Sequence, residues 1–150
     1  CKRPGPTPAI LEMVAREIAD DSGAYIAVMD AAKLAARAVA EHRKSAPGGC
    51  IHGGEFETSL MLYLDQPVEM DEATDEDTFV FDSPFFPRDG FAGSKKAFWS
   101  TWGIQVSKTG IYGTPTVSTR EFGEVVFNAM VDELVAFARE YWKTPTARWE

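Results

Sequence analysis

The residues best suited to chemistry lie together in the segment Cys-Ile-His-Gly-Gly-Glu-Phe-Glu-Thr-Ser-Leu-Met-Leu, which contains His52. Two glycines, Gly53 and Gly54, follow the histidine, and the carboxylates of Glu55 and Glu57 come next. Adjacent glycines let a backbone approach a ligand closely, so both are candidate substrate-binding residues. The carboxylates suit the positive end of a helix that begins here. We therefore expect a functional site at the start of this helix.

Acid–base catalysis is one chemistry open to this segment. The imidazole of His52 precedes Glu57 by five residues across a tight glycine turn. In that arrangement Glu57 can orient His52, or His52 can protonate a leaving group. The alternative is a histidine that only hydrogen-bonds within its own turn.

Metal binding is a second possibility. His52 with Glu55 or Glu57 offers the nitrogen and oxygen ligands that zinc, manganese or iron accept. A catalytic metal needs about three protein ligands, and only one histidine stands near these carboxylates. Glu55 is therefore a candidate metal ligand whose partners are either Asp30 and further residues or groups that come from elsewhere.

The two cysteines offer a third chemistry. An amino-terminal Cys1, exposed by cleavage of a precursor, carries a thiol beside its own α-amine, so nucleophile and base share one residue. The alternative is a chain boundary set by expression or proteolysis. Cys50 lies next to the histidine segment and can be an activated thiol, but a cysteine in a buried, glycine-flanked turn is more often inert.

Composition restricts the partners. With 150 residues, 45% hydrophobic and 25% charged, we expect residues 1–150 to form a single domain with a proper core. The net charge of -8 argues against nucleic acid and anionic membranes and favours a small molecule or a protein. Two cysteines are too few for a disulfide scaffold, so a cytoplasmic location is expected.

Hydrophobic spacing predicts alternating helices and one buried parallel strand in the first part of the chain. Asp30 follows that strand at its carboxyl end, where open α/β sheets bind ligands, and is a candidate pocket residue, the N-cap of the next helix, or both. The expected elements are a helix with one buried face from Thr7 to Asp21 ended by Gly23, the strand 24–29, and an alanine-rich helix from Ala31 to His42.

The second part of the chain is expected to be mixed. An aromatic-rich segment, Ser83 to Gly103, is typical of a subunit contact or pocket lid, and the acidic run 71–77 of a solvated loop. The other expected elements are a nearly all-apolar, mostly buried helix from Phe56 to Leu64, strands at 78–81 and 104–108, a glycine turn at 110–116, and a long helix capped by Ser118 or Thr119.

The central segment resembles the His-(Ala/Gly)-Gly-x-x-Glu-Thr-Ser signature of the creatininase (creatinine amidohydrolase) family, including the apolar helix that follows. Thr7-Pro8-Ala9-Ile10 resembles the helix after that family's Gly-His-Gly-Gly-Asn loop, Ala24 to Asp30 its next strand, and residues 110–116 its Gly-x-x-Gly-Asp-Pro-Thr turn. The resemblance covers nearly the whole chain. It implies an α/β fold with a parallel sheet flanked by helices in three layers, and usually a hexamer.

The resemblance also implies a function. Family members are metal-dependent amidohydrolases that act on cyclic amides or formamides, so a divalent metal is expected, two ions of zinc, manganese or iron. His52 matches the histidine that assists proton transfer to the leaving nitrogen. Glu57 matches the carboxylate of the Glu-Thr-Ser element beside the metal centre.

Several family features are missing from this sequence. The family's metal ligands lie mostly in an upstream Glu-x-His and Asp segment and in the loop just before Thr7, and none of them is present. The fold is therefore expected to be incomplete without an upstream amino-terminal segment, supplied by an amino-terminal fragment or a companion subunit. Ala31, Ala32 and Gly48 occupy the regions of the tryptophans that enclose creatinine, so creatinine is not the expected substrate.

The leading hypothesis is a metal-dependent amidohydrolase that cleaves a small amide as one chain of a split or processed enzyme. One alternative is a hydrolase with Cys1 as its nucleophile. The other is a non-catalytic assembly subunit.

Overall fold

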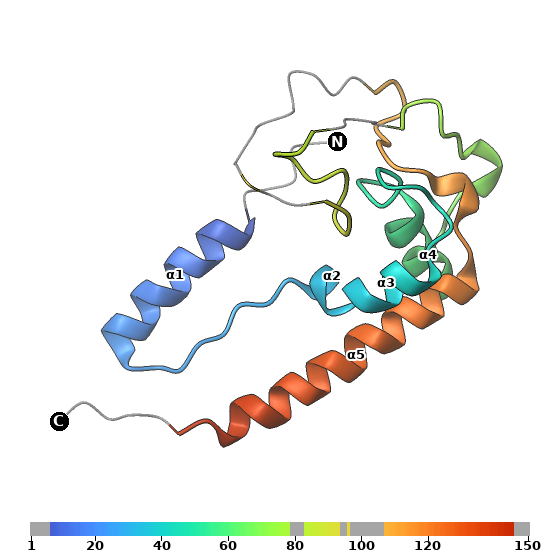
Figure 1. Cartoon of the computed structure of the whole chain (residues 1–150). Helices are drawn as coiled ribbons and strands as arrows, with labels where there is room; N and C mark the ends of the chain where they lie inside the picture. The colour runs from blue at the N-terminus through green and yellow to red at the C-terminus, as the bar shows by residue number, and fades with distance from the viewer. Residues whose placement is uncertain (1–6, 79–82, 94–95, 97–106, 146–150) are drawn as a thin grey trace.

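The structure is a computed structural model that describes residues 7–78, 83–93, 96 and 107–145. Helices dominate this part of the chain (Figure 1). The α-helices are α1 (Thr7–Ser22), α2 (Ala31–Leu34), α3 (Ala36–His42), α4 (Glu55–Tyr63) and α5 (Arg120–Lys143), and the 3-10 helices are η1 (Met70–Glu72) and η2 (Pro115–Val117).

The predicted parallel sheet is not formed within the described residues. Their β pairing is an isolated antiparallel bridge between Ser83 and Phe86. Residues 24–29 are outside any strand, and Tyr25, Ile26 and Val28 are exposed rather than buried. A strand needs a neighbour for its backbone groups, and the described part of the chain provides none for this segment.

The other strand predictions fall mostly outside the described residues, which exclude 79–81 and 104–106. Ser107 and Lys108, at the end of the second predicted strand, lie in a turn instead. Asp77 explains this turn, because its Oδ2 accepts hydrogen bonds from the backbone nitrogens of Lys108 (2.7 Å) and Thr109 (2.9 Å). Asp75 of the same acidic run accepts from the backbone nitrogen and the hydroxyl of Thr116, so both aspartates have a structural role beyond solvation.

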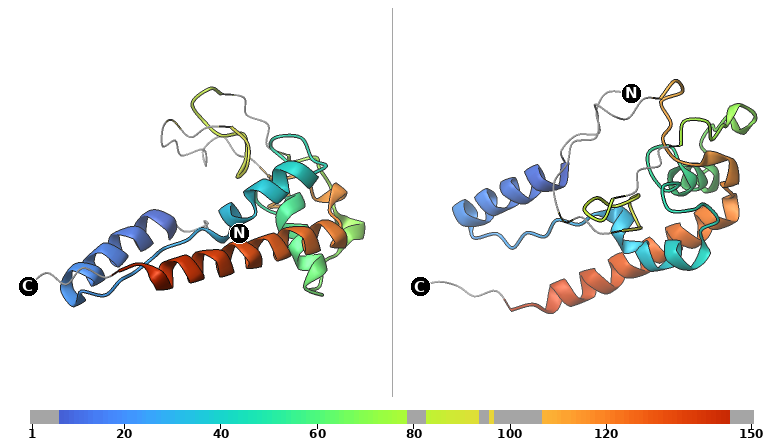
Figure 2. Two further views of the ribbon diagram at one scale, coloured as in Figure 1. Left: turned by 60° about the horizontal axis from the view of Figure 1, so that its bottom comes forward. Right: turned by 45° about the horizontal axis from the view of Figure 1, so that its top comes forward.

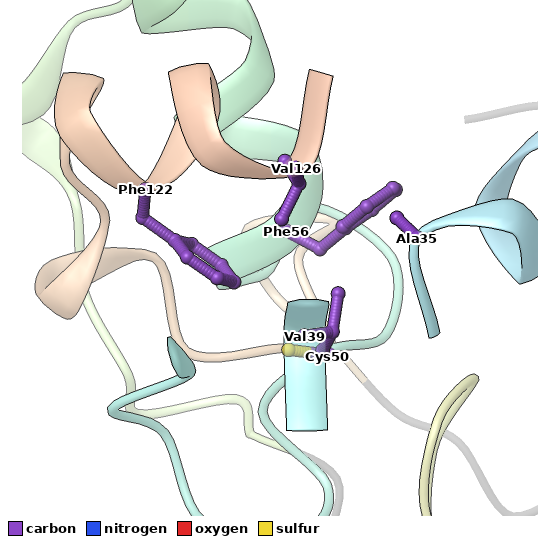
Figure 3. Close-up of a cluster of buried hydrophobic side chains, with 6 residues drawn as sticks. All are labelled: Ala35, Val39, Cys50, Phe56, Phe122 and Val126. Carbon is purple, nitrogen blue, oxygen red and sulfur yellow. The ribbon is translucent and has the colours of Figure 1, made fainter. Parts of the chain in front are cut away.

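The core lies where α2, α3 and α4 meet the first turns of α5 (Figure 3). Gly123 lets α5 pack closely against α4, because a Cβ added at this position would lie only 2.0 Å from the backbone oxygen of Ser59 in α4. The predicted helix from Ala31 to His42 is two helices joined at Ala35, which is itself buried in the core. The buried apolar residues are Ala35, Val39, Cys50, Phe56, Phe122 and Val126.

Helix α5 begins as predicted and leaves the core halfway along its length. Thr119 is the N-cap and accepts a hydrogen bond from the backbone nitrogen of Phe122 (3.1 Å). Val126 is fully buried one turn further on, whereas Leu134, on the same predicted stripe, is 45% exposed. The carboxyl-terminal half of α5 therefore presents apolar side chains to solvent.

Helix α1 lies apart from the core, joined to it by the extended segment 23–30 (Figures 1 and 2). Gly23 ends the helix with a φ of 65°, as predicted. The face expected to be buried is exposed, because the described chain packs little against it. Tyr25 stacks on Tyr141 near the end of α5, with ring centroids 5.0 Å apart. The exposed apolar residues of α1 are Ile10, Leu11, Met13, Val14 and Ile18.

Among the described residues, no helix combines the length and the apolar character needed to cross a membrane.

Candidate functional site

The His52 segment forms a tight turn that leads into α4. The backbone nitrogen of Gly54 donates to the oxygen of Ile51 (2.8 Å), and Gly54 is the N-cap of the helix. Gly53 has a φ of 67°, a conformation that residues with a Cβ rarely adopt. This turn places the imidazole just before the first helical turn.

A second turn, at residues 110–114, closes over the first. The backbone nitrogens of Tyr112 and Gly113 both donate to the oxygen of His52, at 2.9 and 3.1 Å. The glycines are in close contact, because a Cβ added to Gly54 would lie 2.0 Å from the oxygen of Gly49 and 3.0 Å from the Cα of Gly113. The two glycine motifs therefore form one structural unit.

Glu57 is held beside the imidazole of His52. Its Oε2 lies 3.7 Å from Nδ1 of the histidine, within ion-pair range, and accepts a hydrogen bond from the backbone nitrogen of Gly53 (2.6 Å). Thr58 donates from Oγ1 to the oxygen of the same glycine (3.1 Å). Both the His52 and Glu57 side chains are about half exposed, at 41% and 54%. A carboxylate fixed next to an accessible imidazole can orient its ring for proton transfer.

Glu55, the candidate metal ligand, has a carboxylate that is hydrogen-bonded within the protein. Its side chain is fully buried. Oε1 accepts from the backbone nitrogen of Lys44 (2.8 Å), while Oε2 accepts from the nitrogen of Ser45 (2.9 Å) and from its Oγ (2.6 Å). These donors engage both oxygens away from solvent, so Glu55 ties α4 to the loop after α3, and its role as a metal ligand stays a prediction.

Of the remaining predicted site residues, the structure describes Asp30 and not Cys1. Asp30 is confirmed as an N-cap, since its Oδ1 accepts from the backbone nitrogen of Ala32 (3.1 Å), and no described contact links it to the histidine turn. Cys1 lies outside the described residues. Cys50 is buried, and this burial raises the pKa of its thiol, in agreement with an inert cysteine.

Asp89 is a contributor that the sequence did not reveal. Its carboxylate is buried and pairs with Arg43, at 2.7 Å between Oδ2 and Nη2. Oδ2 also accepts from the backbone nitrogens of Gly48 (2.8 Å) and Cys50 (3.3 Å), in the loop before His52. The Asp-Gly pair of residues 89 and 90 is typical of a turn, but nothing in the sequence connects that turn to the central motif.

A hollow of about 500 Å³ lies next to the histidine turn. Two of its lining residues lie beside Gly53: Thr58 donates a hydrogen bond to its oxygen, and a Cβ added to Gly53 would lie 3.1 Å from the side chain of Ile111. Further lining comes from residues 67–70, Glu72, Ala73, Thr109 and Pro115. The hollow lies beside the histidine turn, but its lining residues do not include His52 or Glu57.

A metal centre is not formed by this part of the chain. The described residues contain no group of three or more His, Cys, Asp or Glu side chains placed to hold an ion. His52 and Glu57 supply two donors, and the carboxylate of Glu55 is occupied. These residues alone do not fit a catalytic metal site, which needs about three protein ligands.

An imidazole and an anchored carboxylate at the head of a helix define a candidate acid–base site. The sequence model of the creatininase family, described as creatinine amidohydrolase, matches residues 5–138. The chain therefore belongs to the creatininase family, as the resemblance predicted. Membership of this family implies an α/β fold. Members of the family are amidohydrolases and generally use a divalent metal.

Two curated relatives are more specific. Both are named mycofactocin precursor peptide peptidase and come from Mycobacterium tuberculosis, one from strain CDC 1551 / Oshkosh and one from strain ATCC 25618 / H37Rv. Each is 32% identical over 102 residues, which cover 66% of this chain and 36% of the relative. The match thus spans about a third of the relatives' length. No solved structure matches the chain significantly.

Proposed function

We propose that this chain supplies the acid–base part of an amidohydrolase site. In this proposal His52 protonates the nitrogen that leaves the amide, and Glu57 holds the imidazole in position. The observation that carries the proposal is the 3.7 Å approach of Nδ1 to Oε2 at an accessible turn. Membership of a family of amidohydrolases supports it.

The proposed chemistry follows from the poor leaving ability of an amide nitrogen. Water adds to the carbonyl carbon, and the bond between carbon and nitrogen then breaks. The nitrogen departs as a neutral amine once it takes a proton from the imidazolium of His52, and the neutral imidazole regains a proton from the carboxylic acid that forms. Glu57, fixed through the backbone nitrogen of Gly53, keeps the ring from turning away during this transfer.

The metal forms a separate part of the proposal. We propose two divalent ions of zinc, manganese or iron, held mainly by ligands on another polypeptide segment. The described residues do not make such a site, and the proton transfer proposed for His52 involves no step at a metal.

The partner is an upstream amino-terminal segment or a companion subunit, within a homo-oligomer, which the family resemblance makes a hexamer. Exposed apolar surface supports this part of the proposal. Residues 24–29 are extended, with no strand beside them among the described residues, and the apolar face of α1 is uncovered. A β-strand added to this segment would satisfy its backbone and bury its side chains.

The substrate is proposed to be a small amide of the cyclic or formamide type. The name of the Mycobacterium tuberculosis relatives supports a peptide bond as a second candidate. The two are distinguished by assaying the assembled enzyme on a cyclic amide, a formamide and a short peptide, with the released amine as the common readout.

Replacement of His52 tests the proposal. In the complete assembly, His52→Ala should lower kcat about 100-fold or more, while metal content stays the same. The matched control is His42→Ala, because His42 is the chain's other histidine and is exposed at the end of α3. An unchanged rate in the His52 variant, with the control also active, contradicts the assignment.

The exposed apolar surface also favours a second candidate, a non-catalytic assembly subunit. In that case the complete complex would show neither activity nor bound metal, yet the interface would form. The Cys1 nucleophile predicts something different: an acyl adduct on Cys1, which mass spectrometry of the enzyme mixed with substrate would detect.

A further inference from the structure

We propose that Asp89 is a positioning residue for His52, acting through the loop between residues 48 and 50. The geometric part of this inference stands on hydrogen bonds alone. Its catalytic part rests on the proposed function of His52.

The Asp89 carboxylate joins three segments of the chain. Oδ2 accepts from Arg43 at the end of α3 (2.7 Å) and from the backbone nitrogens of Gly48 (2.8 Å) and Cys50 (3.3 Å). Oδ1 accepts from the backbone nitrogen of Phe91 (2.9 Å), within its own segment. Four donors therefore converge on one buried side chain, and two of them belong to the loop that leads to the histidine.

The backbone on either side of His52 is fixed by different partners. On the amino-terminal side, the peptide groups of Cys50 are held twice, since its nitrogen donates to Asp89 and its oxygen accepts from the nitrogen of Gly90 (3.2 Å). On the other side, the oxygen of His52 accepts from Tyr112 and Gly113. In the same loop, the oxygen of Gly49 also accepts from the backbone nitrogens of Glu55 (3.2 Å) and Thr114 (3.0 Å). Loss of the Asp89 contacts would therefore remove part of the support on the amino-terminal side, and we expect this loss to let the imidazole move relative to Glu57.

The segment that carries Asp89 is itself anchored to the core. The ring of Phe91 packs against that of Phe56 in α4, with centroids 4.9 Å apart. Lys33 of α2 donates from Nζ to the oxygen of Gly90. Asp89 therefore connects the loop before His52 to the same helix that carries Glu57, which makes it suited to setting the distance between the two side chains.

Charge and shape both matter at this position. The side chain of Asp89 has no exposed surface, and that of Arg43 is 12% exposed. An asparagine at position 89 would leave the guanidinium without its carboxylate and would turn an NH₂ group toward some of the present donors. The loop would have to shift to satisfy these groups.

The geometric test uses the chain's two histidines as reporters. In a spectrum of selectively labelled histidine rings, Asp89→Asn should move the His52 signals and leave those of His42 in place. The matched control is Asp65→Asn, which also removes a carboxylate paired with an arginine, Arg120, but on the exposed surface. His52 signals that stay in place in Asp89→Asn overturn the inference.

The kcat of the complete assembly separates a positioning role from a purely structural one, because a purely structural role would leave the kcat of the folded enzyme unchanged. Measured well below the melting temperature of each variant, Asp89→Asn should lower kcat about 10-fold or more with KM within about twofold, because a small displacement of a catalytic group acts on the chemical step. A decrease that only follows the folded fraction, or a kcat equal to that of Asp65→Asn, contradicts the proposal.

A second variant covers the case in which Asp89→Asn does not fold. Asp89→Glu keeps the charge opposite Arg43 and displaces the carboxylate by one methylene, so it should also move the His52 signals. Different results would contradict the proposed function of His52 and the positioning role of Asp89. A fully active His52→Ala enzyme overturns the proposed function, whereas the shift of the His52 signals in the Asp89 variants would still establish the positioning role.

Discussion

The region around His52 and the region around α1 differ in how far their polar groups are hydrogen-bonded and their apolar side chains buried. Around the histidine, buried carboxylates and backbone donors are matched almost completely, as Glu55 and Asp89 show. Around α1 and residues 24–29, apolar side chains and extended backbone are left exposed. The first region is thus specified by this chain, whereas the second has the properties of a surface that another polypeptide covers.

The largest expected effect is in the matched region, at Gly54. Replacing it by alanine places a Cβ 2.0 Å from the oxygen of Gly49 and 3.0 Å from the Cα of Gly113, and neither backbone can move without breaking the paired turns. We expect Gly54→Ala to cost about 4 kcal/mol, above the usual range for overpacking because the contacts are with backbone. Denaturant unfolding measures this loss.

The control for this prediction is Gly90→Ala. The nearest atom to an added Cβ there is the oxygen of Cys50 at 3.4 Å, an ordinary contact. Equal stability of the two variants would mean that the glycine turns are not packed as described.

The next effect is at Asp89 and depends on pH. Burial acts to raise the pKa of Asp89, but hydrogen bonds from Arg43, Phe91 and Gly48 hold it below the ordinary 3.8. Because the folded pKa is lower than the unfolded one, the stabilisation is complete above about pH 4 and is lost as the pH falls through the folded pKa.

Asp89→Asn should therefore cost about 3 kcal/mol near neutrality. The difference from the unmodified chain should shrink as the pH falls below 3.8. Unfolding curves recorded from neutral to acidic pH test this, and a difference that does not change with pH would show that the carboxylate charge contributes nothing.

A pair of identical substitutions along α5 compares the two regions directly. Val126 is fully buried in the core, while Val131 is 40% exposed. Val126→Ala should cost about 2 kcal/mol and Val131→Ala less than about 0.5 kcal/mol. Thermal unfolding of both variants measures the contrast. Similar losses would mean that the second half of α5 is already covered in the isolated chain.

The smallest effect on the isolated chain is expected at Val28, in the exposed extended segment. Val28→Lys should change its stability by less than about 0.5 kcal/mol, as is usual for surface positions. The same change should prevent assembly with the proposed partner, which size-exclusion chromatography of the mixed components would show. Normal assembly of this variant would remove residues 24–29 from the interface.

Features set by neighbouring residues were predictable from the sequence. Gly23 ends α1, Thr119 caps α5 and Asp30 caps α2, because each acts on backbone groups within a few positions of itself. The family was also identifiable from the residues around His52. The catalytic roles of His52 and Glu57 stay predictions.

Features set by distant residues were not predictable. A sequence shows Glu55 two positions before Glu57 but does not show that Lys44 and Ser45 occupy its oxygens. In the same way, no local pattern places Asp89 against the loop at Gly48. The predicted strand at 24–29 depends on a neighbouring strand, and the described residues do not contain one.

The contact between Gly54 and Gly113 has a consequence for how such chains can diverge. Each glycine occupies the space that a methyl group on the other would need, so neither position can accept a larger residue unless its counterpart and the surrounding turns change as well. Two short stretches of sequence that look independent should therefore be inherited as a pair. A descendant that lost the second stretch would also lose the shape of the first, even with every residue around His52 intact.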